Sequence, residues 1–240
     1  MSPPRISGTH RLRGLKNISW LTARQLDQLY NALTITLIEK RAIISDDKHA
    51  PDSAHILLAG AARITCRNSK GQRTLVMMVA PGIVPGFPNP VIGVSYQFRC
   101  EAVTICRVGT IGLEAFVAIS LGVTSEDFKM MALTYLGRWD LVQLRCANFM
   151  SFTLEERLAL TLLELSEQFG SPDAKGTRVS LPTRHRDLAE LVGASRPRIT
   201  EHLIEFERRH LISRNKRQLV INRERMQSFL AQTQIAVVDK

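Results

Sequence analysis

A single glycine between two capped helix patterns is the feature that most constrains how this chain folds. The residues up to Val192 fit an amphipathic helix whose N-cap is Thr183, and the residues up to Arg208 fit a second one whose N-cap is Ser195. Gly193 lies between them, where a tight turn between helices needs a residue that is free to take positive φ. The pattern predicts a helix-turn-helix.

The second helix pattern has two chemically different sides. Ile199, Leu203 and Phe206 recur at spacings of four and three residues and form its apolar side. Charged and polar residues occupy the other side, which is the division that a helix in the DNA major groove needs. The pattern predicts that residues 196–208 form a recognition helix for double-stranded DNA.

Two short β-prone runs follow, over 211–213 and 218–221, on either side of Arg214-Asn215-Lys216-Arg217. They predict a hairpin with a basic tip, the shape of a wing that contacts backbone phosphate. Asn222 is a suitable N-cap for a last short helix. The residues predicted to contact DNA are Arg184, Arg196, Pro197, Arg198, Thr200, Glu201, Arg214, Lys216 and Arg217.

The distribution of charge supports the same location. The net charge of +10 favours a polyanionic partner. Residues 171–240 hold 14 Lys and Arg against 8 Asp and Glu, whereas the other 170 residues hold 18 against 14. Because the C-terminal third is the most basic part per residue, a nucleic-acid contact is expected there.

The N-terminal half has a different character. Residues 1–14 lack periodicity and predict a loose arm, and residues 22–33 predict a short helix with Thr22 as its N-cap. From Thr34 to about Phe116, short runs rich in Ile, Val, Leu and Thr alternate with turns marked by Gly or Pro. This spacing is typical of an all-β sandwich or barrel.

Residues 125–149 contain no Pro and one Gly, and an apolar stripe runs along their whole length. A helix of that length either crosses a large core or pairs with its own copy, and we favour pairing in a homodimer. A second helix is expected over 153–169 and a connector over 171–182. The residues predicted to line the dimer interface are Phe128, Met131, Tyr135, Trp139, Val142 and Cys146.

The four cysteines, Cys66, Cys100, Cys106 and Cys146, show no metal-ligand spacing. We interpret Cys100 and Cys106 as lying in one strand and facing the same side, because their positions differ by six, an even number. Small buried side chains in a reducing compartment are the favoured interpretation, with a thiol switch or a metal site as alternatives. No apolar run approaches membrane-spanning length and no secretory signal is found, so we expect a cytoplasmic protein without a membrane partner.

A resemblance to a known family appears in these motifs. The sequence LAELVGASRPRITEHLIEFERRHLI, followed by RNKRQLVI, resembles the winged helix-turn-helix of the cyclic-AMP receptor protein/FNR family. The sequence EKRAIISDDKHAPDSAHILLAGAARITCRNSKGQRTLVMMVAPG is similar to that family's β-roll sensor domain. The resemblance implies an α+β fold with a cupin-like β-roll over 15–122, a dimerisation helix over 123–150 and a winged helix-turn-helix domain over 151–240. It further implies a transcription regulator that binds a palindromic site as a homodimer, with an effector in the β-roll, and with RNA polymerase as a partner if it activates.

The family's cyclic-nucleotide cassette is not matched. Cyclic-nucleotide binders carry Gly-Glu-Leu after the Pro-Gly turn and a later Arg-Ser, whereas the same register here reads Gly86-Phe87-Pro88 and Tyr96-Gln97. Because the cyclic phosphate would be buried without a paired cation, cyclic AMP is not expected and no cofactor is predicted. An effector, if one binds, is expected to be apolar and to lie near Phe87, Tyr96, Val142 and Gln143.

Other chemistries of the family are also constrained. Residues 1–30 lack the cysteine cluster of the oxygen-sensing branch, which excludes its iron–sulfur cluster. A haem- or thiol-based sensor of the same family is the alternative function, with His49, His55, Cys66, Cys100 and Cys106 as available ligands. No catalytic motif is found, so an enzyme is not expected.

The recognition helix departs from the cyclic-AMP receptor branch, in which its first, second and sixth positions are Arg, Glu and Arg. Here these positions are Arg196, Pro197 and Glu201. Pro197 is unable to hydrogen-bond a base, and Glu201 is able to accept a hydrogen bond from cytosine N4. We therefore expect a half-site that differs from TGTGA and TTGAT.

Overall fold

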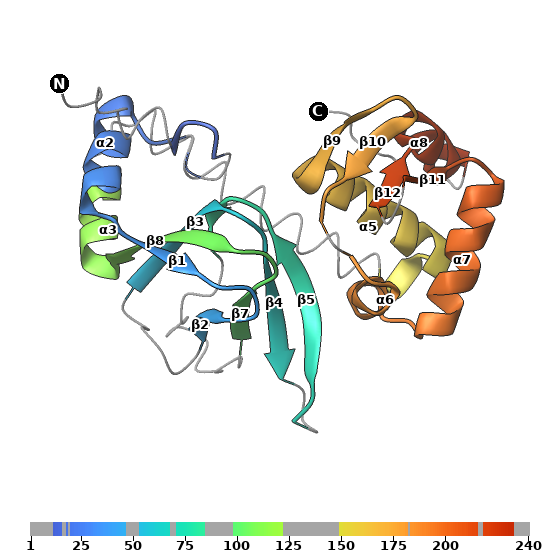
Figure 1. Cartoon of the computed structure of the whole chain (residues 1–240), viewed down its shortest axis with the longest axis horizontal. Helices are drawn as coiled ribbons and strands as arrows, with labels where there is room; N and C mark the ends of the chain where they lie inside the picture. Colours follow the sequence, from blue (N-terminus) through green and yellow to red (C-terminus); the bar gives the residue numbers. More distant parts are fainter. Residues whose placement is uncertain are drawn as a thin grey trace. The chain divides into compact units, whose positions relative to one another are not determined.

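The computed structural model describes residues 12–15, 18, 20–46, 53–67, 71–84, 98–121, 149–181, 183–215 and 218–232. The chain divides into two compact units, Met1–Val142 and Gln143–Lys240, and each is described by itself (Figure 1). In the part of the chain that the structure describes, no helix is both long and apolar enough to span a bilayer.

The first unit contains two four-stranded antiparallel sheets, one in the order β1-β8-β3-β6 and the other in the order β2-β7-β4-β5. This arrangement confirms the predicted β-roll. The strands are β1 Thr34–Ile38, β2 Ile43–Asp46, β3 Ser53–Ala59, β4 Ala62–Arg67, β5 Arg73–Val79, β6 Gly82–Ile83, β7 Phe98–Ala102 and β8 Cys106–Gly112.

The alternation of side chains along β3 separates two cores. Leu57 belongs to a cluster between the sheets, together with Ile64, Cys100 and Val108. Ala54 and Ile56 belong instead to a cluster on the other face of their sheet. Successive side chains of a strand point to opposite faces, so β3 is buried on both.

A helical layer covers that other face of the sheet. It contains α2 (Ala23–Ala32) and α3 (Leu113–Leu121), which contact each other (Figure 1). The predicted N-cap of α2 is confirmed, because Thr22 Oγ1 accepts from the Gln25 N–H at 3.3 Å and Gln25 Oε1 accepts from the Thr22 N–H at 2.9 Å. Gln25 Nε2 also donates to the Ile119 carbonyl at 2.9 Å, which joins the two helices.

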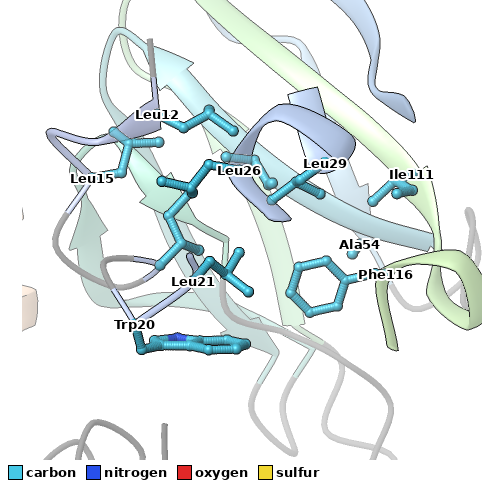
Figure 2. Close-up of a cluster of buried hydrophobic side chains, with 11 residues drawn as sticks. Leu12, Leu15, Trp20, Leu21, Leu26, Leu29, Ala54, Ile111 and Phe116 are labelled. Carbon is cyan, nitrogen blue, oxygen red and sulfur yellow. The ribbon is translucent and has the colours of Figure 1, made fainter. Parts of the chain in front are cut away.

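Two expectations for the ends of this unit were wrong. Leu12 falls within the predicted loose arm, yet it is fully buried beside Leu15 and Leu26 (Figure 2). Of the predicted arm, the described residues 12–14 belong to the fold, because Leu12 is part of the apolar cluster of the helical layer. The β-rich region, expected to extend to about Phe116, ends at Gly112, because α3 begins at Leu113. The apolar sequence of α3 has no clear helical periodicity, since Val117 and Ala118 are apolar but exposed.

The two central cysteines lie in different strands, which corrects the prediction of one strand. Cys100 is in β7 and Cys106 is in β8, and these strands belong to different sheets. The chain crosses between the sheets at Val103, whose N–H donates to the Ala61 carbonyl at 2.8 Å. Both thiols are nevertheless buried in the cluster between the sheets.

The second unit packs helices around a smaller antiparallel sheet in the order β11-β12-β10-β9. The expected connector over 171–182 was wrong over most of its length, because it forms the hairpin β9–β10 and completes this sheet. The elements are α5 Leu154–Phe169, β9 Gly170–Asp173, β10 Gly176–Val179, α6 His185–Val192, α7 Arg196–Arg208, β11 Ile212–Asn215, β12 Gln218–Ile221 and α8 Arg223–Gln232.

We predict that Leu12→Ala lowers the free energy of unfolding of the first unit, which contains the β-roll and is called the sensor unit below, by about 2–5 kcal/mol. The reason is that the substitution leaves a cavity in the helical layer. Leu37→Ala is the matched control, since the Leu37 side chain is 68% exposed, and it should change stability by less than about 0.5 kcal/mol. Urea unfolding of the full chain, followed by circular dichroism, measures both. If the two variants lower the free energy of unfolding equally, the buried side chain of Leu12 does not stabilise this unit.

Candidate DNA-binding interface

The first helix of the motif, α6, begins one residue later than predicted, with its N-cap at Arg184 instead of Thr183. Thr183 does not cap it, because its hydroxyl and its N–H both donate to the Leu181 carbonyl, at 3.2 and 2.8 Å. Arg184 occupies the N-cap position, and its N–H donates to the Asp187 carboxylate at 2.9 Å. Leu188, Ala189 and Val192 are buried as predicted, whereas Leu191 is only half-buried.

The turn after α6 has the predicted left-handed residue. Gly193 has φ 66° and ψ 47°, and the Ala194 N–H donates to the Ala189 carbonyl at 2.8 Å. A Cβ on Gly193 would lie 3.0 Å from the ring of Phe149. Both the backbone conformation and the space at this turn therefore favour glycine.

Arg157 of α5 fixes this turn relative to the segment that enters the domain. Its Nε donates to the Val192 carbonyl at 3.1 Å and a terminal nitrogen donates to the Phe152 carbonyl at 2.7 Å. The guanidinium also lies over the Phe149 ring, 5.5 Å from its centroid. The end of α6 and the start of the domain are thus joined by one side chain.

The second helix, α7, has the predicted bounds and the predicted buried side. Ile199, Leu203 and Phe206 have no exposed surface. The Phe206 ring meets Phe229 of α8 edge to face, with 5.9 Å between the ring centroids. Arg209 follows the helix and lies over the other aromatic partner, 4.6 Å from the centroid of Phe229.

A salt bridge completes this attachment. Arg209 donates to the Glu155 carboxylate of α5 at 2.8 Å, and both side chains are about one-third exposed. The recognition helix is therefore held by apolar packing beneath it and by one ion pair at its end. Its other side faces away from the domain core.

The structure brings most of the predicted DNA contacts to one surface. Pro197 and Glu201 of α7 are exposed on the side opposite Ile199, and Arg196 and Arg198 are exposed at the flanks in the first turn of the helix. Arg184 before α6 and Arg214 of β11 are also exposed. Lys216 and Arg217 lie outside the described residues.

Thr200 differs from its predicted neighbours, because its hydroxyl already has two partners. It donates to the Arg196 carbonyl at 3.1 Å and lies 2.9 Å from Nδ1 of His185. A hydroxyl has a single proton, so with that proton on the carbonyl it accepts from the His185 N–H. Thr200 thereby joins α7 to the start of α6.

Carboxylates accompany several of the cations on this surface. Arg214 donates to Glu207 at 2.7 Å, and these side chains are 46% and 32% exposed. Arg208 binds both carboxylate oxygens of Glu205, at 2.8 and 2.7 Å. These hydrogen bonds lower the pKa of Glu205, so the carboxylate stays ionised.

His185 is a residue of this surface that sequence reasoning missed. Partial burial, together with the positive charges of Arg214 and Arg196, lowers the pKa of its imidazole from the ordinary value of 6.5. The ring therefore favours its neutral form next to a cationic surface. The sequence pattern at His185, the first residue of α6, did not predict a role at this surface, because its contact with Thr200 depends on how α6 and α7 pack together.

The sensor unit offers titratable groups but no completed effector site among its described residues. His55 Nδ1 lies 3.1 Å from Thr110 Oγ1, and burial lowers the pKa of the ring. Burial, with smaller effects of Cys106 and Glu101, raises the pKa of the Cys100 thiol to about 12. A thiol with so high a pKa is a poor nucleophile at neutral pH.

Two predicted sets of residues lie outside the described residues. The predicted effector pocket comprises Phe87, Tyr96, Val142 and Gln143, and it stays a prediction. The predicted dimer interface also stays a prediction, with Phe128, Met131, Tyr135, Trp139, Val142 and Cys146.

Comparisons with known proteins agree with this geometry. Residues 156–229 match the family model of the Crp-like helix-turn-helix domain. The chain is similar to the nitrogen fixation regulation protein FixK of Azorhizobium caulinodans, with 23% identity across 80% of this chain and 76% of FixK. It is also similar to a CRP-like cAMP-activated global transcriptional regulator of Mycobacterium tuberculosis, with 26% identity across 71% of this chain and 76% of that protein.

The fold also matches solved structures. The structure of FixK2 from Bradyrhizobium japonicum superimposes with a TM-score of 0.67 and 20% identity, covering 86% of this chain and 99% of FixK2. A β-roll followed by a winged helix-turn-helix with an exposed recognition helix defines a DNA-binding transcription regulator. Residues 156–229 thus form a Crp-like helix-turn-helix domain, and the chain as a whole is similar in sequence and fold to transcription regulators of the CRP/FNR family.

We predict that the stability of the C-terminal domain decreases as the pH falls below about 6.5, partly because of His185. Its pKa is lowered in the folded state, so the unfolded state binds the proton first and stability is lost through this window. Thermal unfolding between pH 7.5 and 5.5 should show a smaller decrease for His185→Asn. His210→Asn is the control, because the His210 side chain is exposed. If the melting temperature of His185→Asn decreases with pH as steeply as that of the wild type, His185 does not contribute to this pH dependence.

Proposed function

We propose that this regulator binds DNA as a homodimer and recognises a palindromic site through α7 of each protomer. The observation that carries the proposal is the division of α7 into a fully buried apolar side and an exposed side with Arg196, Arg198 and Glu201. A helix with one buried side presents the other to the major groove in a fixed orientation. The apolar stripe in the sequence of residues 128–146 supports pairing of two copies.

Each exposed group is assigned a role by its chemistry. Arg196 donates to guanine O6 and N7 or to phosphate, and Glu201 accepts from cytosine N4. Arg184, Arg198 and Arg214 contact phosphates, and Arg214 exchanges the Glu207 carboxylate for a phosphate oxygen when it does so. Thr200 and Pro197 contribute shape and backbone position, because the Thr200 hydroxyl is already bonded and Pro197 has no donor.

We further propose that the β-roll responds to an apolar effector rather than to a cyclic nucleotide. The sequence Gly86-Phe87-Pro88 and Tyr96-Gln97 supports this, because it offers neither a carboxylate for ribose nor a cation for phosphate. The high pKa of Cys100 argues against that thiol as a redox switch.

Selection of bound fragments from genomic DNA by the purified full chain tests the proposal. The recovered sequences should share an inverted repeat whose half-sites lie about one helical turn apart. The half-site should contain a C·G pair, and Glu201→Ala should relax the preference at that pair. The proposal fails if no fragment is enriched with or without cell extract, or if the enriched motif has no two-fold symmetry.

We predict that Arg198→Ala weakens binding to all sequences alike and makes it less dependent on salt. Each lost phosphate contact reduces the slope of log K against log salt by about 0.9, so a dimer should lose about 1.8. Titration of a labelled fragment at several salt concentrations measures this slope. Arg225→Ala is the matched control, because Arg225 is an exposed arginine of α8 outside the proposed interface. An unchanged slope for Arg198→Ala would remove it from the interface.

A further inference from the structure

One residue on the exposed side of α7 has no role in the site described above. Ile204 is 57% exposed, although it is a large apolar side chain. Phe149 and Met150, before α5, are the other large hydrophobic side chains that are exposed in the described residues of this unit, and none of the other residues of α7 is of this kind. Burial in the domain core does not explain this isoleucine, because the buried side of α7 is formed by Ile199, Leu203 and Phe206 and does not include it.

Ile204 lies on the same line of the helix surface as two proposed DNA contacts. It follows Glu201 by three residues and Pro197 by seven, and these spacings place side chains on one face of a helix. Pro197 and Glu201 are exposed as well. Along the centre of the side that faces the groove, the carboxylate of Glu201 therefore lies between two apolar side chains, Pro197 and Ile204.

The surroundings of Ile204 indicate which partner covers it. Arg208 is exposed one turn further along α7, where it pairs with Glu205, and Glu201 is exposed one turn before Ile204. An apolar group between a carboxylate and a guanidinium suits a partner that offers hydrogen-bond donors, anionic groups and small apolar groups close together. The DNA major groove has this composition, since phosphates line its edges and the C5 methyl of thymine projects into it.

We propose that Ile204 is a specificity-determining residue that packs against the C5 methyl of a thymine in each half-site. Three residues of helix advance by about 4.5 Å, and stacked base pairs are about 3.4 Å apart. The thymine therefore lies roughly one to two base pairs from the C·G pair that Glu201 recognises. This proposal rests on the proposed function, because it requires α7 to lie in the major groove.

Replacement of single thymines by deoxyuridine tests the proposal, since it removes only the methyl group. The full chain is titrated with its selected site and with sites in which each thymine is replaced in turn, symmetrically in both half-sites. Wild-type protein should lose about fourfold in affinity per half-site at one thymine close to the C·G pair. That loss corresponds to about 0.8 kcal/mol at 1.4 kcal/mol per tenfold change.

Ile204→Ala should weaken binding to the unmodified site by a similar factor and should be insensitive to deoxyuridine at that thymine. Val76→Ala is the matched control, because it shortens an exposed β-branched side chain of the sensor unit, and it should keep the wild-type response. Thermal unfolding of both variants should match the wild type, since Ile204 is exposed.

The outcomes distinguish the two proposals. If the wild-type chain binds no DNA, the proposed function itself is overturned. Binding with no sensitive thymine, with a sensitive thymine far from the C·G pair, or with equal sensitivity in Ile204→Ala would overturn the role of Ile204 alone. Reduced transcription by Ile204→Ala with unchanged DNA affinity would also overturn it and would indicate a protein partner at this residue.

Discussion

The packing of one side of α7 onto the rest of its domain is the interaction on which the DNA-binding surface depends. Ile199, Leu203 and Phe206 are removed from water completely, and the edge-to-face contact of Phe206 with Phe229 restricts rotation of the helix about its axis. A helix that rotates freely presents no defined set of side chains to a groove. Apolar burial on the inner side therefore determines which polar groups are presented on the outer side.

The same principle extends to the turn between the two helices of the motif. Arg157 contacts the Val192 carbonyl and the Phe149 ring, so the entry to the domain and the end of α6 behave as one body. The absence of a Cβ at Gly193 is what permits this closeness, since the aromatic ring occupies the space that a side chain would need. A glycine that is needed for backbone conformation is here also needed for packing.

The sequence was sufficient to predict the local parts of this structure. Capping residues, apolar spacing and Gly193 predicted the bounds of α7 and of β12 and the β-rich character of the first unit, because these depend on nearby residues. The strand β11 extends further than predicted, since Arg214 and Asn215 pair with β12 instead of forming the turn. Contacts between distant residues were not predictable in the same way. The pairing of β9 with β10, the burial of Leu12 and the contact of His185 with Thr200 each depend on segments that the tertiary fold brings together.

The ion pairs on the exposed surface have a consequence for how such a regulator searches a genome. Arg208 and Arg214 are held by Glu205 and Glu207, so contact with DNA exchanges one anionic partner for another instead of satisfying a free charge. Binding to DNA of random sequence then gains little free energy, so the protein dissociates from such DNA quickly. The protein stays bound longer only where contacts with bases add to the exchange of carboxylate for phosphate. A modest affinity for DNA in general thereby becomes a preference for a few specific sites.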